Sequence, residues 1–183
     1  ALVTITDDEQ VAVDTGLGKD QLQHIRRVIL GVDGVLELHL LRTRRIGGRA
    51  LVDVHIIVDE DISVSEGHYI SEMVRTRLVN EVDVVADALV HIDPEDDTHL
   101  TPARDLPSRS AVHAQLKARF KDIDAATQIE RITLHYVGGR LRVELLLPLS
   151  VLANPDAGRQ LAARFQAAVA KDSWIETLDV RFH

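Results

Sequence analysis

The sequence feature that most constrains the fold is a recurring Gly-Gly step, first at Gly47-Gly48 and again 91 residues later at Gly138-Gly139. Each step lies between two short segments in which apolar side chains alternate with polar or charged ones. Successive side chains of a β-strand point to opposite faces of a sheet, so each pair of segments predicts a β-hairpin. The chain therefore contains two predicted hairpins in equivalent places.

The segments around the hairpins repeat as well. An amphipathic helix precedes each hairpin, a second helix follows it, and an alternating strand comes last. We predict helices over 19–30, 65–80, 108–123 and 156–171, and strands over 35–43, 52–58, 88–93, 129–137, 141–147 and 174–182. The predicted fold class is α+β, with αββαβ twice in tandem. Right-handed crossovers place both helices of each module on one face of a three-stranded mixed sheet.

The repeat divides the chain into four expected regions. Residues 1–18 lack a sustained period, 19–94 form the first module, 95–107 form a proline-containing linker, and 108–183 form the second module. Each module is small for independent stability, so we expect it to pack against another module or another chain.

Composition narrows the choice of partner. The net charge of −8 disfavours nucleic acid, which requires a basic surface, and suits cations. The absence of cysteine fits a reducing cytoplasm and rules out thiolate ligands, so a metal here would need imidazole and carboxylate groups. The chain has nine histidines to supply them, and its apolar runs are too short to span a bilayer.

Residue parity predicts the two faces of the first sheet. Even-numbered residues of the strands, including Leu36, Leu38 and Leu40, are apolar and are expected to face the helices. Odd-numbered residues are expected on the opposite, open face. Leu41 would be one of them.

The open face gathers metal-binding side chains from all three strands: His39, Asp53, His55, His91 and Asp93. If the third strand pairs with the second, histidines of adjacent strands lie ~4.8 Å apart and can converge on one ion through bonds of ~2.1 Å. Asp93 could bridge two ions. A single histidine on a polar strand face is ordinarily just solvated, but three in register beside a carboxylate are harder to attribute to chance.

Other motifs are weaker. His68 lies in the first turn of a helix, where parity does not give its direction. The basic run 42–45 is expected to pair with local carboxylates, and the acidic run 95–97 to be a solvated linker. No phosphate-binding loop, dinucleotide fingerprint or nucleophile elbow is present in the sequence. We interpret the remaining histidines as ordinary surface residues: His24, His99, His113, His135 and His183.

Four segments resemble, in order and spacing, the C-terminal cytoplasmic domain of cation diffusion facilitator (cation efflux) transporters. They are His39-Leu40-Leu41-Arg42-Thr43-Arg44, Val54-His55-Ile56, Ser65-Glu66-Gly67-His68 and Val90-His91-Ile92-Asp93-Pro94. The resemblance covers about 13–94 and implies a ferredoxin-like, metallochaperone-like αββαβ domain. It also implies that this domain hangs below a six-helix membrane domain and forms a V-shaped homodimer.

The resemblance also implies a ligand set. In zinc-transporting members, the positions of His39, His55, His68, His91 and Asp93 form a binuclear metal site near the dimer interface. Whether His68 serves its own chain or the partner stays open. The ion implied first is Zn²⁺, with Fe²⁺, Mn²⁺, Co²⁺ or Cd²⁺ as alternatives.

The same resemblance assigns roles to the other regions. Asp14 resembles an aspartate of the hinge beneath the last membrane helix, so residues 1–18 would be the exit from that helix. In the second module, the 91-residue offset places Glu130, Leu146, Arg159 and Phe182 where the first has histidines. We therefore expect a degenerate copy that binds no metal.

The leading hypothesis is a non-enzymatic regulatory domain of a divalent metal cation efflux transporter. Such a domain would lie on the cytoplasmic side of the plasma membrane as a soluble fragment, and it would partner divalent cations, a second copy and its own transmembrane domain. The full-length protein would exchange zinc for protons. One alternative is a soluble ligand-binding regulatory protein with paired modules. Another is a hydrolytic metalloenzyme, although no general base is evident in the sequence.

Overall fold

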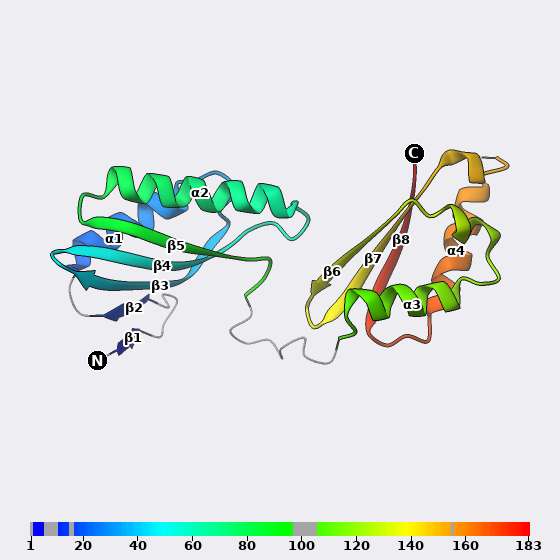
Figure 1. Cartoon of the computed structure of the whole chain (residues 1–183), viewed down its shortest axis with the longest axis horizontal. Helices are drawn as coiled ribbons and strands as arrows, with labels where there is room; N and C mark the ends of the chain where they lie inside the picture. The colour runs from blue at the N-terminus through cyan, green and yellow to red at the C-terminus, as the bar shows by residue number, and fades with distance from the viewer. Residues whose placement is uncertain (1, 6–10, 15–16, 97–105, 155) are drawn as a thin grey trace. The chain divides into compact units, whose positions relative to one another are not determined.

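The structure is a computed structural model that describes residues 2–5, 11–14, 17–96, 106–154 and 156–183 (Figure 1). It divides into two compact units, Ala1–His99 and Leu100–His183. Each unit has its own hydrophobic core. Asp14 lies in a strand whose side chains are not described, and His99 lies outside the described residues.

The first unit has the predicted αββαβ order, preceded by two short strands. Its elements are β1 (Leu2–Ile5), β2 (Val11–Asp14), α1 (Lys19–Leu30), β3 (Glu37–Ile46), β4 (Arg49–Ile57), α2 (Val64–Glu81) and β5 (Val85–Asp93). The sheet order is β1-β2-β3-β4-β5; β3 and β4 are antiparallel, and β4 and β5 are parallel. The three predicted strands are therefore confirmed, and β1 and β2 extend the sheet beyond β3. Both helices cover the same face (Figure 1).

The middle strand carries the core of this unit. Val52, Val54 and Ile56 of β4 are almost completely buried, as their even numbers predict. Ile25 and Ile29 of α1 belong to the same buried cluster. Each such side chain contributes ~1.5–3 kcal/mol when it is removed from water, so the register of β4 is strongly specified.

A β-bulge interrupts β3. Leu38 is the Cα partner of Ile56, whereas Leu40 is the partner of His55, so two steps along β3 match one step along β4. His39 is the extra residue. Because the bulge inserts one residue, it reverses which face each later residue of β3 points to.

The parity prediction for β3 is therefore wrong beyond the bulge. Leu41 is 1% exposed and Thr43 is buried beside it, so these residues face the helices. Leu40 shares the open side with its partner on β4. Leu36 precedes the strand and is 64% exposed.

The second unit repeats the architecture. Its elements are α3 (Arg109–Arg119), η1 (Asp124–Gln128), β6 (Arg131–Val137), β7 (Arg140–Leu147), η2 (Leu149–Val151), α4 (Ala157–Val169) and β8 (Ile175–Phe182). The sheet order is β6-β7-β8, with β6 and β7 antiparallel and β7 and β8 parallel. This confirms the predicted tandem α+β fold.

One packing detail recurs in both units. A Cβ atom built on Gly67 of α2 would lie 3.4 Å from Cδ1 of Ile92, and one built on Gly158 of α4 would lie 3.4 Å from Cε2 of Phe182. In both units the first turns of the second helix thus approach the last strand closely. The shared approach supports the interpretation of the units as copies of one module.

Gly34, between α1 and β3, tests the packing of the first unit. Its φ is 88°, and a Cβ there would meet Cδ1 of Ile70 at 2.6 Å. Gly48 has the same φ but no atom within 4 Å of a built Cβ. We expect Gly34→Ala to destabilise the first unit by ~1–3 kcal/mol through backbone strain and more through the clash, and Gly48→Ala to show the strain alone.

Hydrogen exchange of α1 and α2 amides measures the first unit in the intact chain. Trp174, the single tryptophan, lies in the second unit. Its fluorescence should therefore not change in either variant. Equal destabilisation by Gly34→Ala and Gly48→Ala would contradict the contact with Ile70.

Candidate metal site

A buried carboxylate at the end of β5 is surrounded by three histidines. Asp93 Oδ2 lies 2.8 Å from Nε2 of His39 and 3.2 Å from Nδ1 of His55. Asp93 Oδ1 lies 2.9 Å from Nε2 of His91. The structure therefore brings together four of the predicted site residues in one chain.

The sheet explains this convergence. His55 and His91 are Cα partners on the parallel strands β4 and β5, and their ring centroids are 4.6 Å apart. The His39 ring lies 5.5 Å from that of His55. The bulge supplies His39 from β3, so three adjacent strands each contribute one imidazole.

The cluster is closed at one end and open at the other. His39 and Asp93 are each 7% exposed. The His55 side chain is 30% exposed and that of His91 is 60% exposed. Burying a carboxylate is costly unless polar partners surround it, and the three rings supply those partners. An ion could enter from the side of His91.

The donor set fits a divalent metal ion. One ligand atom each from His39, His55 and Asp93 lie within 4.8 Å of one another. Two ligand atoms on one ion with bonds of ~2.1 Å can be ~4 Å apart at most, so adjustments of under 1 Å bring them together. Imidazole and carboxylate ligands suit zinc, manganese, iron, cobalt and nickel.

Sequence reasoning missed one member of this cluster. Asp96 Oδ1 lies 3.3 Å from Nδ1 of His39, on the opposite side of the ring from Asp93. We expected the acidic run after Pro94 to be a solvated linker; Asp96 is exposed, but its carboxylate also contacts the buried His39, which we did not expect. Its signal in the sequence was a carboxylate three residues beyond Asp93, just after the strand ends.

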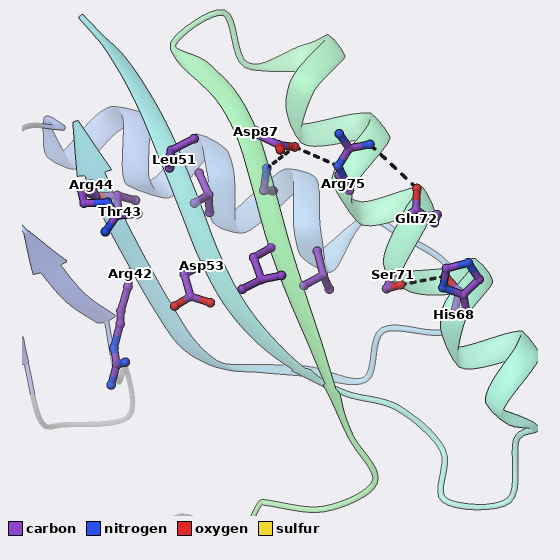
Figure 2. Close-up of a pocket in the computed structure, with 14 residues that line it drawn as sticks. Arg42, Thr43, Arg44, Leu51, Asp53, His68, Ser71, Glu72, Arg75 and Asp87 are labelled. Carbon is purple, nitrogen blue, oxygen red and sulfur yellow. Dashed lines mark hydrogen bonds and ion pairs between the residues drawn. The ribbon is translucent and has the colours of Figure 1, made fainter. Parts of the chain in front are cut away.

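His68 and Asp53 lie elsewhere in the single chain. Among the described residues, the contacts of Asp93 are with the three histidines and not with His68 or Asp53. His68 is exposed on α2, where its carbonyl accepts a hydrogen bond from Ser71. Both residues line a groove of about 810 Å³. Figure 2 shows His68 on α2 at one side of this groove and Asp53 on β4 at the other side, beyond β5.

The groove also contains charged residues that are partly paired. Arg75 of α2 donates to Asp87 of β5 at 2.8 Å, and Glu72 lies 3.9 Å from the same guanidinium (Figure 2). On the far side Arg42 and Asp53 are Cα partners on β3 and β4. The imidazole of His68 is therefore presented on an exposed surface of mixed charge, away from the buried cluster.

The second unit lacks this constellation at the equivalent places. Leu146 is the Cα partner of Arg181, as His55 is of His91, so Arg181 rather than Phe182 takes the place of His91. The prediction that equivalent residues of the two units lie a constant 91 residues apart is therefore wrong for β8. The chain reaches β8 from β7 with one residue fewer than it needs to reach β5 from β4.

The last residue of the second unit takes the place of Asp93. The Val58 N–H donates to the Asp93 carbonyl in the first unit, and the Leu149 N–H donates to the His183 carbonyl in the second. His183 Nε2 lies 2.6 Å from Oε2 of Glu130. The second unit therefore has a carboxylate in the place of His39 and a histidine in the place of Asp93.

Arg181 brings a fixed positive charge to this face. Its guanidinium donates to Glu144 Oε1 at 2.5 Å. A guanidinium has no lone pair to offer a metal, so one of the three imidazole positions is replaced by a group that repels cations.

No helix among the described residues is both long and apolar enough to cross a membrane.

Comparisons with known proteins agree on the first unit. Residues 17–95 match the family model described as "Cation efflux protein, cytoplasmic domain". Metal tolerance protein C1 of Arabidopsis thaliana is 32% identical over 149 residues, which are 78% of this chain and 32% of that protein. Cation-efflux pump FieF of Yersinia pestis (strain Pestoides F) is 32% identical over 85 residues, 46% of this chain and 28% of that protein.

Two further matches cover less of this chain. Metal tolerance protein 2 of Oryza sativa subsp. japonica is 41% identical over 80 residues, 44% of this chain and 21% of that protein. A solved structure of MamM-CTD is 23% identical with a TM-score of 0.41, over 42% of this chain and 98% of that chain. This chain spans about a third or less of the length of the curated relatives named here.

The Arabidopsis match extends beyond the first unit. It covers 78% of the chain, whereas the first unit ends at His99 of 183 residues. Part of the second unit is therefore shared with that relative.

We expect the second unit to bind no divalent ion tightly. In a chain with His39, His55, His91 and Asp93 all changed to alanine, Glu130 and His183 remain, but two exposed ligands give little affinity. Calorimetric titration with Zn²⁺ should show no stoichiometric site in this variant. A remaining tight site that disappears on further change of His183 to alanine would contradict this prediction.

Proposed function

The chain belongs, through residues 17–95, to the family of cation efflux protein cytoplasmic domains, and we propose that it is the regulatory, metal-binding and dimerisation part of a divalent metal cation efflux transporter. The observation that carries the metal-binding role is the buried Asp93 carboxylate surrounded by three imidazoles. We propose a non-catalytic role, and the match of residues 17–95 to the cytoplasmic domain of cation efflux proteins supports it.

We propose that the site holds two ions bridged by Asp93. The two oxygens of its carboxylate face different histidines: Oδ2 faces His39 and His55, and Oδ1 faces His91. This division supports one ion on each oxygen. The Oδ1 side is the exposed side and has a single imidazole, so it needs a further ligand.

His68 of the partner subunit is the proposed further ligand. Within its own chain His68 is exposed on α2 and does not contact the Asp93 cluster. A second copy can present this imidazole to the open His91 side of the cluster. Metal would then link two subunits, which would make dimer closure depend on metal.

Regulation follows from differential binding. An ion that contacts ligands from both subunits binds the closed dimer better than the open one, and only such a difference can shift the equilibrium. The ions also neutralise part of the repulsion between two chains that each carry a net charge of −8. The fraction of closed dimer would thus rise with the concentration of cytoplasmic metal, and the transporter would respond to that concentration.

The proposed ion is Zn²⁺, because three imidazoles and one carboxylate suit it well. The same ligands accept Fe²⁺, Mn²⁺, Co²⁺ or Cd²⁺. One relative, 25% identical over 84 residues, is named a manganese efflux system protein, MneP of Bacillus subtilis (strain 168). Titration with each ion separately will rank them.

The remaining parts of the proposal concern the full-length protein. We propose that a transmembrane domain carries out metal export in exchange for protons, and that residues 1–18, with Asp14, form the hinge to it. Residues 19–94 would form the dimerisation domain, 95–107 a linker, and 108–183 a degenerate copy with a structural or partner-binding role.

The first test changes His39, His55, His91 and Asp93 together to alanine. We expect Zn²⁺ to bind the wild-type chain stoichiometrically and to make its dimer more compact, and the variant to lose both responses with an affinity decrease of more than ~100-fold. Calorimetry measures binding, and small-angle X-ray scattering measures compactness.

His24→Ala is the matched control, because His24 lies on α1 and its ring contacts the Glu81 carbonyl. It should behave as wild type. Unchanged stoichiometry and compactness in the quadruple variant would refute the proposed site and favour a regulatory protein that is indifferent to zinc.

The second test asks which subunit supplies His68. We expect a mixture of His68→Ala chains with His39→Ala/His55→Ala chains to regain part of the two-ion binding that each lacks alone, because heterodimers contain one complete site. If His68 served its own chain, no combination would restore a site, and the mixture would bind as the average of its parts.

A further inference from the structure

We propose that Asp96 is a positioning residue for this site, which holds His39 in the tautomer that presents Nε2 to the metal. The inference rests on the proposed metal-binding function. Its basis is that the two ring nitrogens of His39 contact different carboxylates. Nε2 lies 2.8 Å from Asp93 and Nδ1 lies 3.3 Å from Asp96.

The two carboxylates differ in their surroundings. Asp93 is 7% exposed and contacts three imidazoles, so it lies at the centre of the ligand set. The Asp96 side chain is 44% exposed and lies on the outer side of one ring. Asp93 is therefore the ligand, and Asp96 is the partner of the nitrogen that does not bind metal.

A neutral imidazole has one N–H and one lone pair, and only the nitrogen with the lone pair can bind a metal. A carboxylate that accepts the N–H fixes the tautomer and the ring orientation and makes the other nitrogen a better donor. With Nδ1–H donated to Asp96, the lone pair of His39 is on Nε2. This is the nitrogen on the side of Asp93.

His39 needs such a partner more than the other two histidines do. It is 7% exposed, so water has little access to its ring, whereas the side chains of His55 and His91 are 30% and 60% exposed. A buried ring with the wrong tautomer would direct an N–H at the ion. The chain brings Asp96 to this ring through a bend at Pro94 and Glu95, directly after β5.

The test compares two variants of Asp96 in the full chain. Asp96→Ala removes the acceptor, and we expect Zn²⁺ affinity to fall ~10–100-fold with unchanged stoichiometry. Asp96→Asn keeps an acceptor oxygen without the charge, and we expect it to recover most of the affinity. Asp61→Ala, in the loop after β4, is the control for loss of one negative charge in the same unit, and it should match wild type.

A second measurement follows the ring of His39 in the Zn²⁺-loaded protein. Nitrogen NMR should show an Nδ1–H that exchanges slowly with water in wild type and in Asp96→Asn, where residue 96 accepts it, and one that exchanges faster in Asp96→Ala. A purely structural role of Asp96 would leave this exchange unchanged.

The remaining outcomes are distinguishable. If wild type binds no Zn²⁺, the proposed function fails, and the positioning role fails with it. If wild type binds but affinity and Nδ1–H exchange do not change in Asp96→Ala, only the positioning role is overturned. If both Asp96 variants lose an ion from the stoichiometry, Asp96 is a ligand and the positioning role is again overturned.

Discussion

The Asp93 carboxylate is buried at the edge of a sheet, and three imidazoles from three adjacent strands surround it. An isolated buried charge would be expensive, so this arrangement persists only while the strands keep their register. A shift of β5 by one residue would move Asp93 to the helix face and take His91 with it. The packing of β4 against the two helices therefore determines the geometry of the polar cluster on the other side. The core residues and the residues of the candidate metal site thus lie on opposite faces of the same strands.

The bulge in β3 shows how a local irregularity serves this geometry. His39 is the residue inserted between the partners of Ile56 and His55. A regular strand would have kept Leu40 with the core and left Leu41 outside. Instead Leu41 and Thr43 are buried, and His39 is brought within hydrogen-bond distance of both Asp93 and Asp96. A bulge re-aims a side chain and changes the register of the strand beyond it, and here the re-aimed side chain is the most enclosed imidazole of the cluster.

The second unit separates the fold from its chemistry. It keeps the order of strands, the pairing pattern and the close approach of helix to last strand at Gly158 and Phe182. On its open face Arg181 pairs with Glu144 and His183 with Glu130. These contacts satisfy the polar groups of this face without an added cation. Apolar packing on one face is thus enough to specify the module, and the polar face is free to differ.

Patterns that repeat with the period of a strand or helix could be predicted from the sequence alone. The two Gly-Gly hairpins, the αββαβ order and the shared face of His39, His55, His91 and Asp93 follow from local alternation, because regular strands place side chains by parity. Features that depend on an inserted residue or on a chain reversal could not. The bulge at His39, the burial of Leu41, the contact of Asp96 with His39 and the place of Arg181 each depend on which backbone groups pair across strands. Local sequence does not encode that pairing, because burial and hydrogen bonding between distant segments decide it.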